Sequence, residues 1–570
     1  MVSRAQSKAI AEAKKPKTKG VSNKKQPEPT KTEILKKRKR TAAPSKDVVE
    51  VNKEPRESTK KVTKIAKITK KVTKPEPSTK KKASKPIKAT KKKTKTESAT
   101  DGVDVFINNS SLSAKTRKNA IKSIKDAEKK FKKSKKRKQL GDSTVTKQRK
   151  IAIPIFQQRK FLPEINIAPE VPSISGDLFV FGNGDCGQLG LGEDMIERKK
   201  PYPVDLGGEE VVDVQSGGLH TIALCKSGKV WSWGCNDQKA LGRSGEEYLP
   251  GIIEGLEDKE IVKIACGDSI SLALTKEGRL YSWGTYRSAE GIMGFSSDTT
   301  IQETPKMIEE IKLAKIVDVA TGVDHVLALS SVGEVYTWGN GQQFQLGRKV
   351  IDRRLKAGLN PDRLHLRNVV SIGAGSYHSF AATNDGTLFS WGLNNFGQCG
   401  LSPNDGGDEP LVTVPTEVAA LKGQQILKME GGEHHSIVMN SNGELFGFGR
   451  SDSHQTGLPQ DIIDSFSEVQ KKKNEVTNGD SSGHKTKVPI PTLIPNLEKI
   501  KSFSCGSNHN LAVSENGKTL YSWGYGDMLQ CGNGEEEDVD VPTAVSGQKI
   551  DGKTFIKVSG GGQHSALIAA

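Results

Sequence analysis

The sequence lacks the features that mark membrane proteins, disulfide-stabilised proteins and metalloenzymes. No stretch approaches the roughly 20 consecutive apolar residues that cross a membrane as a helix, and the first residues carry no apolar signal region. The seven cysteines are scattered and include no Cys-x-x-Cys pair, which argues against a disulfide framework or a zinc site. Neither an HExxH motif nor a Cys/His cluster is present. We therefore expect an intracellular protein that is not an enzyme, with no metal, no cofactor and no membrane contact.

Aromatic side chains are almost absent from the first 160 residues, which are rich in Lys, Thr, Ser and Pro. This segment holds 51 Lys and Arg against 14 Asp and Glu, a net charge of +37, and the remaining 36 basic and 53 acidic residues give −17. A segment that buries so little apolar area cannot offset its conformational entropy. We interpret residues 1–160 as a disordered Lys-rich tail, followed by a linker at 161–174 and an acidic globular domain at 175–570.

Two runs of basic residues lie within the tail. They consist of Lys36, Lys37, Arg38, Lys39 and Arg40, and of Lys135, Lys136, Arg137 and Lys138. Such runs are typical of nuclear import signals and nucleic-acid contacts. A tail of this charge would neutralise DNA phosphates with strong salt dependence and no sequence preference. We expect a nuclear, chromatin-associated protein that binds an import receptor and DNA.

A Trp-Gly or Phe-Gly pair, here the WG pair, recurs seven times in the globular part. The pairs are Phe181-Gly182, Trp233-Gly234, Trp283-Gly284, Trp338-Gly339, Trp391-Gly392, Phe448-Gly449 and Trp523-Gly524. The steps between the aromatic positions are 52, 50, 55, 53, 57 and 75 residues. A period near fifty indicates a repeat architecture. The long last step contains the Lys- and Ser-rich residues 459–490, which we expect to be a flexible insertion.

Each repeat predicts a β-hairpin. A Gly-x-x-His segment leads into alternating apolar residues, a tight turn such as Ser227-Gly228 follows, and the return strand ends at the WG pair. Short strands at this period, seven times over, predict an all-β fold, the seven-bladed β-propeller. The first WG pair has no hairpin strand before it, and the Gly-x-x-His segment at Gly561 has no WG pair after it. These incomplete units predict one blade closed across the termini, without an exposed sheet edge.

Strand direction separates two faces of this propeller. Gly-x-x-His begins the outgoing strand and the WG pair ends the returning one, so both lie at the same end of each blade. The histidine recurs in six of the seven repeats, which favours a structural hydrogen-bond partner over a ligand; Ile270 replaces it once and is expected to alter the local loop.

The polar residues between Gly and His suit a protein-binding rim, with solvated loops as the alternative. They are Asp268, Asp324, Glu433, His434 and Asn508.

The third repeat differs from the others in length. From the Gly of the WG pair to the Gly that closes the following turn, the step is 8 residues in six repeats and 10 in the third, from Gly284 to Gly294. Residues 285–294 are therefore expected to protrude from the face that carries the Gly-x-x-His segments. A neutral surface insertion is the alternative, since added loop residues cost little entropy.

This repeat, with turns such as Gly187-Gln188-Leu189-Gly190, resembles the regulator of chromosome condensation family over residues 175–570. The resemblance implies a guanine-nucleotide exchange factor for a Ran-type small GTPase, without bond chemistry, that serves nucleocytoplasmic transport and mitosis. It also implies that the protrusion is a wedge that enters the nucleotide site of the GTPase. The implied GTPase-binding positions are Asp185, Asp268, Asp324 and His434, with Arg287, Ser288, Ala289, Glu290 and Gly291 in the wedge.

The fourth repeat carries a basic segment in an otherwise acidic domain. Residues 348–367 include Arg353 and Arg354, and the family has a loop in this blade that touches the acidic surface of the nucleosome. The resemblance therefore implies a histone contact here in addition to the tail. A chromatin- or histone-binding propeller scaffold without exchange activity is the alternative function, and the longer third repeat argues against it.

Overall fold

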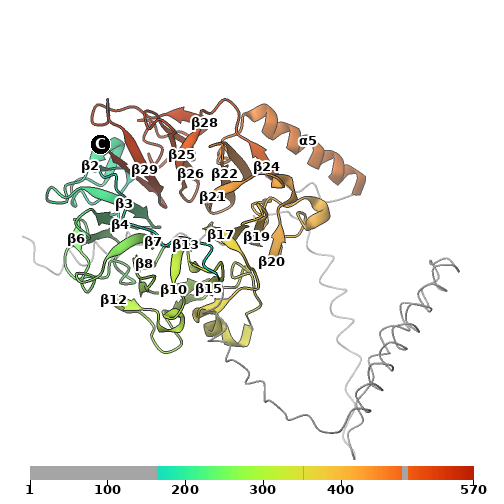
Figure 1. The fold of residues 1–570 in the computed structure, drawn as a ribbon. Helices are drawn as coiled ribbons and strands as arrows, with labels where there is room; N and C mark the ends of the chain where they lie inside the picture. Colours follow the sequence, from blue (N-terminus) through green and yellow to red (C-terminus); the bar gives the residue numbers. More distant parts are fainter. Residues whose placement is uncertain (1–162, 351, 478–485) are drawn as a thin grey trace, which may run out of the picture. The chain divides into compact units, whose positions relative to one another are not determined.

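Seven four-stranded antiparallel sheets surround a central opening in the computed structural model, which describes residues 163–350, 352–477 and 486–570 (Figure 1). The predicted all-β, seven-bladed propeller is confirmed. A further two-stranded sheet is formed by β10 (Tyr286–Ser288) and β11 (Gly291–Gly294). The predicted tail, with its basic runs at 36–40 and 135–138, lies outside the described residues.

Every blade has one strand at each of four positions from the centre outward. The innermost strands are β29 (Phe555–Gly560), β3 (Val211–Ser216), β7 (Ile261–Cys266), β13 (Ile316–Thr321), β17 (Val369–Ala374), β21 (Ile426–Gly431) and β25 (Ile500–Cys505). The second strands are β30 (His564–Ala569), β4 (His220–Cys225), β8 (Ile270–Thr275), β14 (His325–Ser330), β18 (His378–Thr383), β22 (His435–Asn440) and β26 (His509–Ser514). The third strands are β1 (Asp177–Asn183), β5 (Val230–Gly234), β9 (Leu280–Gly284), β15 (Val335–Gly339), β19 (Leu388–Leu393), β23 (Leu445–Arg450) and β27 (Leu520–Gly524). The outer strands are β2 (Glu197–Pro203), β6 (Gly251–Ile252), β12 (Gln302–Met307), β16 (Asp362–Arg363), β20 (Leu411–Glu417), β24 (Lys487–Leu493) and β28 (Val539–Ala544). We number the blades 1 to 7 in this order.

Blade 1 combines strands from both ends of the domain. β1 pairs antiparallel with β30, with Phe181 opposite Ser565 and Gly182 opposite His564. The sheet order is β2-β1-β30-β29, so the first two and the last two strands share one sheet. Neither β1 nor β30 is therefore left as an open edge.

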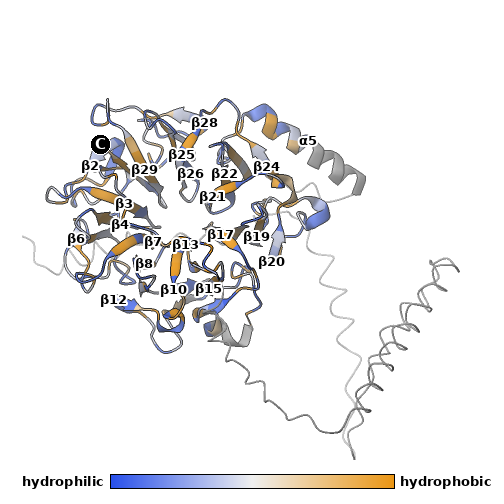
Figure 2. Cartoon of the chain, viewed as in Figure 1, coloured by the Kyte–Doolittle hydropathy of each residue, from blue (hydrophilic) through white to orange (hydrophobic). Residues whose placement is uncertain are grey.

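The second strands form the most completely buried layer of the propeller. All seven are buried at every residue, because the neighbouring blades cover both faces of each sheet. Hydrophobic residues accordingly concentrate in inner strands such as β3, β7 and β13, whereas the loops are mostly hydrophilic (Figure 2). Between the blades, the aromatic residues of the WG pairs are buried, with at most 2% of their surface exposed. Burial of such large side chains is a main source of stability.

The glycine of the WG pair is required by the register of the hairpin. Gly234 lies opposite His220, and the other six WG glycines pair with the corresponding histidine or with Ile270. Gly234 has φ +108°, and a Cβ atom there would lie 2.5 Å from the carbonyl oxygen of Leu219. This register places the Gly-x-x-His loops and the segments after the WG pairs at one end of the blades. We call this end the wedge face and the opposite end, with the tight hairpin turns, the turn face.

The described chain begins on the turn face. Ile165 donates its backbone N–H to Ser331, which lies in a hairpin turn of blade 4. The amide of Asn166 donates to the carbonyl oxygen of Val369 at 2.9 Å, and Ser175 bonds to Glu210 of blade 2 at 2.7 Å. The predicted linker is thus tied to blades 4 and 5 and the residue after it to blade 2, so the chain enters the propeller opposite the wedge face.

Helices occupy some of the connections between strands. They are η2 (Glu309–Ile311), η3 (Asp352–Leu359), η4 (Pro403–Asp405), η5 (Ala419–Leu421) and α5 (Gln460–Thr477). α5 lies within the expected insertion at 459–490, and the sequence did not predict it. Its Ile463 is fully buried, and Phe466 packs against the same core cluster near β24. Residues 478–485 lie outside the described residues, and the last residues of the insertion belong to β24.

Candidate functional site

Six Gly-x-x-His loops and the corresponding loop of blade 3, residues 267–270, meet around one end of the central channel, on the wedge face. The polar residues expected at this rim differ in exposure: Asp268 is exposed, Asp324 is only 9% exposed, and Glu433, His434 and Asn508 are half-buried. The loops therefore form the expected rim around the channel. Its members, however, are not equally accessible to a partner.

The repeated histidines connect neighbouring blades. Each buried Nε2 atom lies 2.7–2.9 Å from a side-chain oxygen of the next blade. The pairs are His220–Ser271, His325–Ser379, His378–Ser436, His435–Asn510, His509–Ser565 and His564–Thr221. In five of them the hydroxyl donates its own proton to a backbone carbonyl of the preceding blade. The histidine must then donate from Nε2, so each is a neutral structural donor in what we call the inter-blade relay.

Burial keeps these imidazoles neutral. Loss of hydration lowers the pKa of His220 to about 4 and the pKa of His509 to about 3. The Nδ1 atoms of all six relay histidines are buried without a hydrogen-bond partner, so a second proton would bring an uncompensated charge. Within the described residues, no group of three or more His, Cys, Asp or Glu is arranged to hold a metal ion.

The relay is missing between blades 3 and 4. Ile270 stands in the histidine position and Val326 in the hydroxyl position, and both are fully buried in one apolar cluster with Tyr286. In four other blades the Trp of the WG pair donates Nε1–H to a carbonyl of the preceding blade at 2.8–3.2 Å. Trp338 instead donates to the hydroxyl of Tyr286 at 2.7 Å. Ile270 therefore changes the packing of the core between blades 3 and 4, to which the longer loop of blade 3 contributes Tyr286.

That loop is the β10–β11 hairpin, here the wedge hairpin, residues 285–294. Tyr286 and Met293 are buried at its base. Toward the tip, Arg287, Ala289, Glu290 and Ile292 are exposed, and Ser288 and Gly291 are half-buried. The five predicted wedge positions are thus brought together at one accessible tip on the wedge face.

Asp324 supports this hairpin from blade 4. Its Oδ1 accepts the backbone N–H of Arg287 at 2.6 Å. Burial, followed by the repulsion of Asp268, raises the pKa of Asp324 to about 7. Asp268 is reached by solvent but crowded by the rim loops, and this partial loss of hydration raises its pKa to about 6, with Arg287 opposing the shift. The contact of Asp324 with the hairpin backbone could not be read from the sequence.

Asp185 and His434 lie elsewhere on the wedge face. Asp185 is exposed in blade 1, where its backbone carbonyl accepts the hydroxyl of Tyr248 at 3.0 Å. The His434 ring packs at 4.8 Å from Phe396, measured between ring centroids, and lies 3.7 Å from a carboxylate oxygen of Glu433. These two positions belong to blades 1 and 6, whereas the wedge hairpin belongs to blade 3.

The basic segment 348–367 divides into internal and exposed cations. Arg348 donates to the carbonyl oxygens of Thr337 and Asn360, and Arg363 forms an ion pair with Glu334. Lys349, Lys356 and Arg367 are exposed. The predicted Arg353 and Arg354 fall in η3, but their side chains lie outside the described residues.

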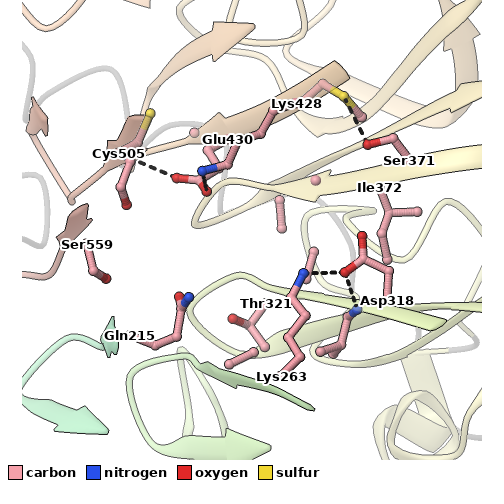
Figure 3. Close-up of a pocket in the computed structure, with 18 of the residues that line it drawn as sticks. Gln215, Lys263, Asp318, Thr321, Ser371, Ile372, Lys428, Glu430, Cys505 and Ser559 are labelled. Atoms are coloured by element: carbon pink, nitrogen blue, oxygen red, sulfur yellow. Dashed lines mark hydrogen bonds and ion pairs between the residues drawn. The ribbon is translucent and has the colours of Figure 1, made fainter. Parts of the chain in front are cut away.

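A cavity of about 400 Å³ runs along the central channel, lined by all seven innermost strands (Figure 3). Two lysines that line it pair with carboxylates, Lys263 with Asp318 and Lys428 with Glu430. Lys557 pairs with Asp213 between the innermost strands of blades 1 and 2. Figure 3 shows the first two pairs, one between β7 and β13 and the other within β21. The positive charges of these lysines are therefore compensated by neighbouring carboxylates. Among the described segments, no helix is long and apolar enough to cross a membrane.

Comparison with known proteins identifies the family. Residues 177–567 match the model of the RCC1-like domain. The chain is 38% identical to the guanine nucleotide exchange factor SRM1 of Saccharomyces cerevisiae, over 68% of this chain and 86% of that protein. It is 33% identical to the human regulator of chromosome condensation, over 69% of this chain and 90% of that protein. A crystal structure of Prp20p from Saccharomyces cerevisiae, described with its binding properties to Gsp1p and histones, is similar with a TM-score of 0.65 and 38% identity, covering 70% of this chain and 93% of that chain. The chain therefore belongs to the regulator of chromosome condensation family.

Proposed function

We propose that this chain is a guanine-nucleotide exchange factor for a Ran-type small GTPase, acting on chromatin in the nucleus. The observation that carries the proposal is the wedge hairpin. Among the described residues it occurs in one blade of seven, replaces the regular turn there and presents an exposed tip. Its Arg287 interacts electrostatically with Asp268. The relatives named as an exchange factor and as a Gsp1p- and histone-binding protein support the same function.

No bond is made or broken in this mechanism. The wedge face binds the GTPase more tightly without nucleotide than with it, and by reciprocity the bound factor weakens nucleotide binding by the same ratio. The wedge tip disturbs the nucleotide site while acidic side chains such as Asp268 pair with basic residues of the GTPase. Exchange is accelerated in both directions, so the surrounding ratio of GTP to GDP sets its net direction.

Release of labelled GDP from a Ran-type GTPase tests this proposal. The wild-type chain is expected to accelerate release, and Asp324→Ala to lower the acceleration roughly 5- to 100-fold, since the Arg287 amide loses its acceptor. Asp324→Asn keeps an acceptor of the same size and is expected to lose less. Wild-type protein that leaves the release rate unchanged would refute exchange and favour the scaffold function.

Chromatin binding is assigned to the tail, with the exposed cations of 348–367 as a second contact. The described chain starts on the turn face, whereas the wedge hairpin lies on the opposite face. The tail runs at 36–40 and 135–138 also fit an import receptor.

The DNA affinity of the full chain is expected to fall steeply with salt. Replacing the nine basic residues of the two runs by Ala should flatten the plot of log K against log salt by roughly 0.9 per lost phosphate contact. Titrations of labelled duplex at several salt concentrations measure this slope. An identical slope for both proteins would locate the DNA contact elsewhere.

A further inference from the structure

Two side chains of blade 4 hold the wedge hairpin from outside. The amide nitrogen of Asn340 donates to the carbonyl oxygen of Arg287 at 3.1 Å. The amide nitrogen of Gln342 lies 3.1 and 2.9 Å from the two carboxylate oxygens of Glu290, and its oxygen accepts the backbone N–H of Ala289 at 3.4 Å. One residue therefore fixes the middle of β10 and the other fixes the tip.

Asparagines in the equivalent loops of other blades, at the same position in Asn183 and one residue later in Asn236 and Asn394, have a local role. Asn183 accepts from Asp185 in its own loop, and Asn236 bonds to Leu241 and Arg243 in its own loop. Asn394 likewise bonds within its own loop and its continuation, to Cys399, Gly407 and Glu409. Asn340 keeps one such bond, to the N–H of Gln342, but directs its amide nitrogen across the blade boundary. This departure from the repeat occurs next to the one hairpin that also departs from it.

The hairpin needs such support. A two-stranded hairpin alone is marginally stable in water, and β10 and β11 share only three paired positions with a register shift among them. Its base is anchored by the buried Tyr286 and Met293. The tip has no comparable apolar anchor, since Ala289 and Glu290 are exposed. Its position is set by Asn340, Gln342 and Asp324.

We propose that Asn340 and Gln342 are positioning residues for nucleotide exchange, which hold the wedge tip at the angle at which it enters the GTPase. This inference rests on the proposed exchange function. Neither residue needs to touch the GTPase, because each acts through the hairpin. Asn340 is 6% exposed, so its effect on exchange would pass through Arg287.

Asn340→Ala is expected to lower the kcat of exchange roughly 10- to 100-fold, as displacement of a reacting element by about 1 Å does, with little change in KM for the GTPase. Asn236→Ala is the matched control, because it removes a buried asparagine from the equivalent loop of blade 2, away from the hairpin. Amide hydrogen exchange should be faster over 286–294 in the first variant and unchanged there in the second. Equal kcat values for the two variants would overturn the proposal.

Gln342 is tested by a double-mutant cycle with Glu290. If Gln342 acts by holding that carboxylate, Gln342→Ala, Glu290→Ala and the double variant should lower kcat by similar factors rather than multiplicatively. Multiplying effects would show that Gln342 does not act through Glu290 and would contradict this part of the proposal. Wild-type protein without exchange activity would refute the proposed function, whereas an active wild type with an unaffected Asn340→Ala variant would refute only the positioning role.

Discussion

Replacing the wedge hairpin by the regular turn of the neighbouring blade is expected to abolish exchange while preserving the propeller. In this variant residues 235–242 of blade 2 take the place of residues 285–294. The seven loops around the channel remain, but nothing enters the nucleotide site. We expect the acceleration of GDP release to fall on the order of 100-fold or more, because the missing element acts only in the exchange step.

The structure indicates how to keep that variant folded. A regular turn presents a backbone carbonyl that accepts both a WG indole and a second side-chain donor of the next blade, as Gln188 accepts from Trp233 and Thr221. With Val326 in place, that carbonyl would have only the indole of Trp338 as a side-chain donor. Adding Ile270→His and Val326→Ser would rebuild the inter-blade relay, with the indole nitrogen of Trp338 as a second donor. The rebuilt variant should melt near the wild-type temperature and show no exchange. Full exchange activity in a folded variant would show that the hairpin is dispensable.

The architecture was predictable because its causes are local and repeated. A strand register that pairs His220 with Gly234 leaves no room for a Cβ atom at the glycine, so the WG pair and the Gly-x-x-His segment carry the hairpin geometry in their own spacing. The same spacing located the longer third repeat. Closure of blade 1 followed from the two incomplete units at the ends of the domain.

The supports of the hairpin were not predictable, because they join residues of different blades. Asp324 and Arg287 are 37 positions apart, and Asn340 lies 53 positions from Arg287. Nothing in the spacing of either residue identifies its partner, and Asn340 stands at the same position as Asn183 of blade 1, whose side chain bonds within its own loop. The sequence showed that Ile270 departs from the repeated histidine, but only the structure shows that it packs with Val326 and Tyr286 in one apolar cluster. Helix α5 was missed since its apolar residues are few and its surroundings are polar.

Acid is expected to destabilise the propeller sharply between pH 6.5 and 4. Burial lowers the pKa of the relay histidines, for example to about 4 in His435 and about 3 in His325, whereas in the unfolded chain they titrate near 6.5. Between these values the unfolded state binds more protons, so stability is lost as the pH falls. Each buried histidine costs about 2 kcal/mol on going from pH 7 to 5, and six cost on the order of 10 kcal/mol.

The two rim aspartates act in the opposite direction. Their pKa values are raised in the folded state, to about 7 for Asp324 and about 6 for Asp268, so the folded state takes up their protons first and gains stability as the pH falls through this range. Asp324 offsets about 2 kcal/mol of the loss between pH 7 and 5. The exposed Asp268 offsets less because solvent screens its charge. The histidines therefore dominate.

Denaturant unfolding at pH 7, 6 and 5, followed by the fluorescence of the buried WG tryptophans, measures this loss. His509→Gln is the informative variant, because the glutamine amide can donate to Ser565 but does not titrate. The variant should have a lower free energy of unfolding at pH 7. Below pH 6.5 that free energy should fall less steeply with pH, by about 1.4 kcal/mol per pH unit, because one fewer proton is taken up on unfolding. An unchanged slope would assign the acid lability to other groups. If the slope falls as expected, the six histidine contacts that join the blades at neutral pH are the parts of the propeller that acid weakens most. The boundary between blades 3 and 4, which has no such histidine, is then the one that acid leaves intact.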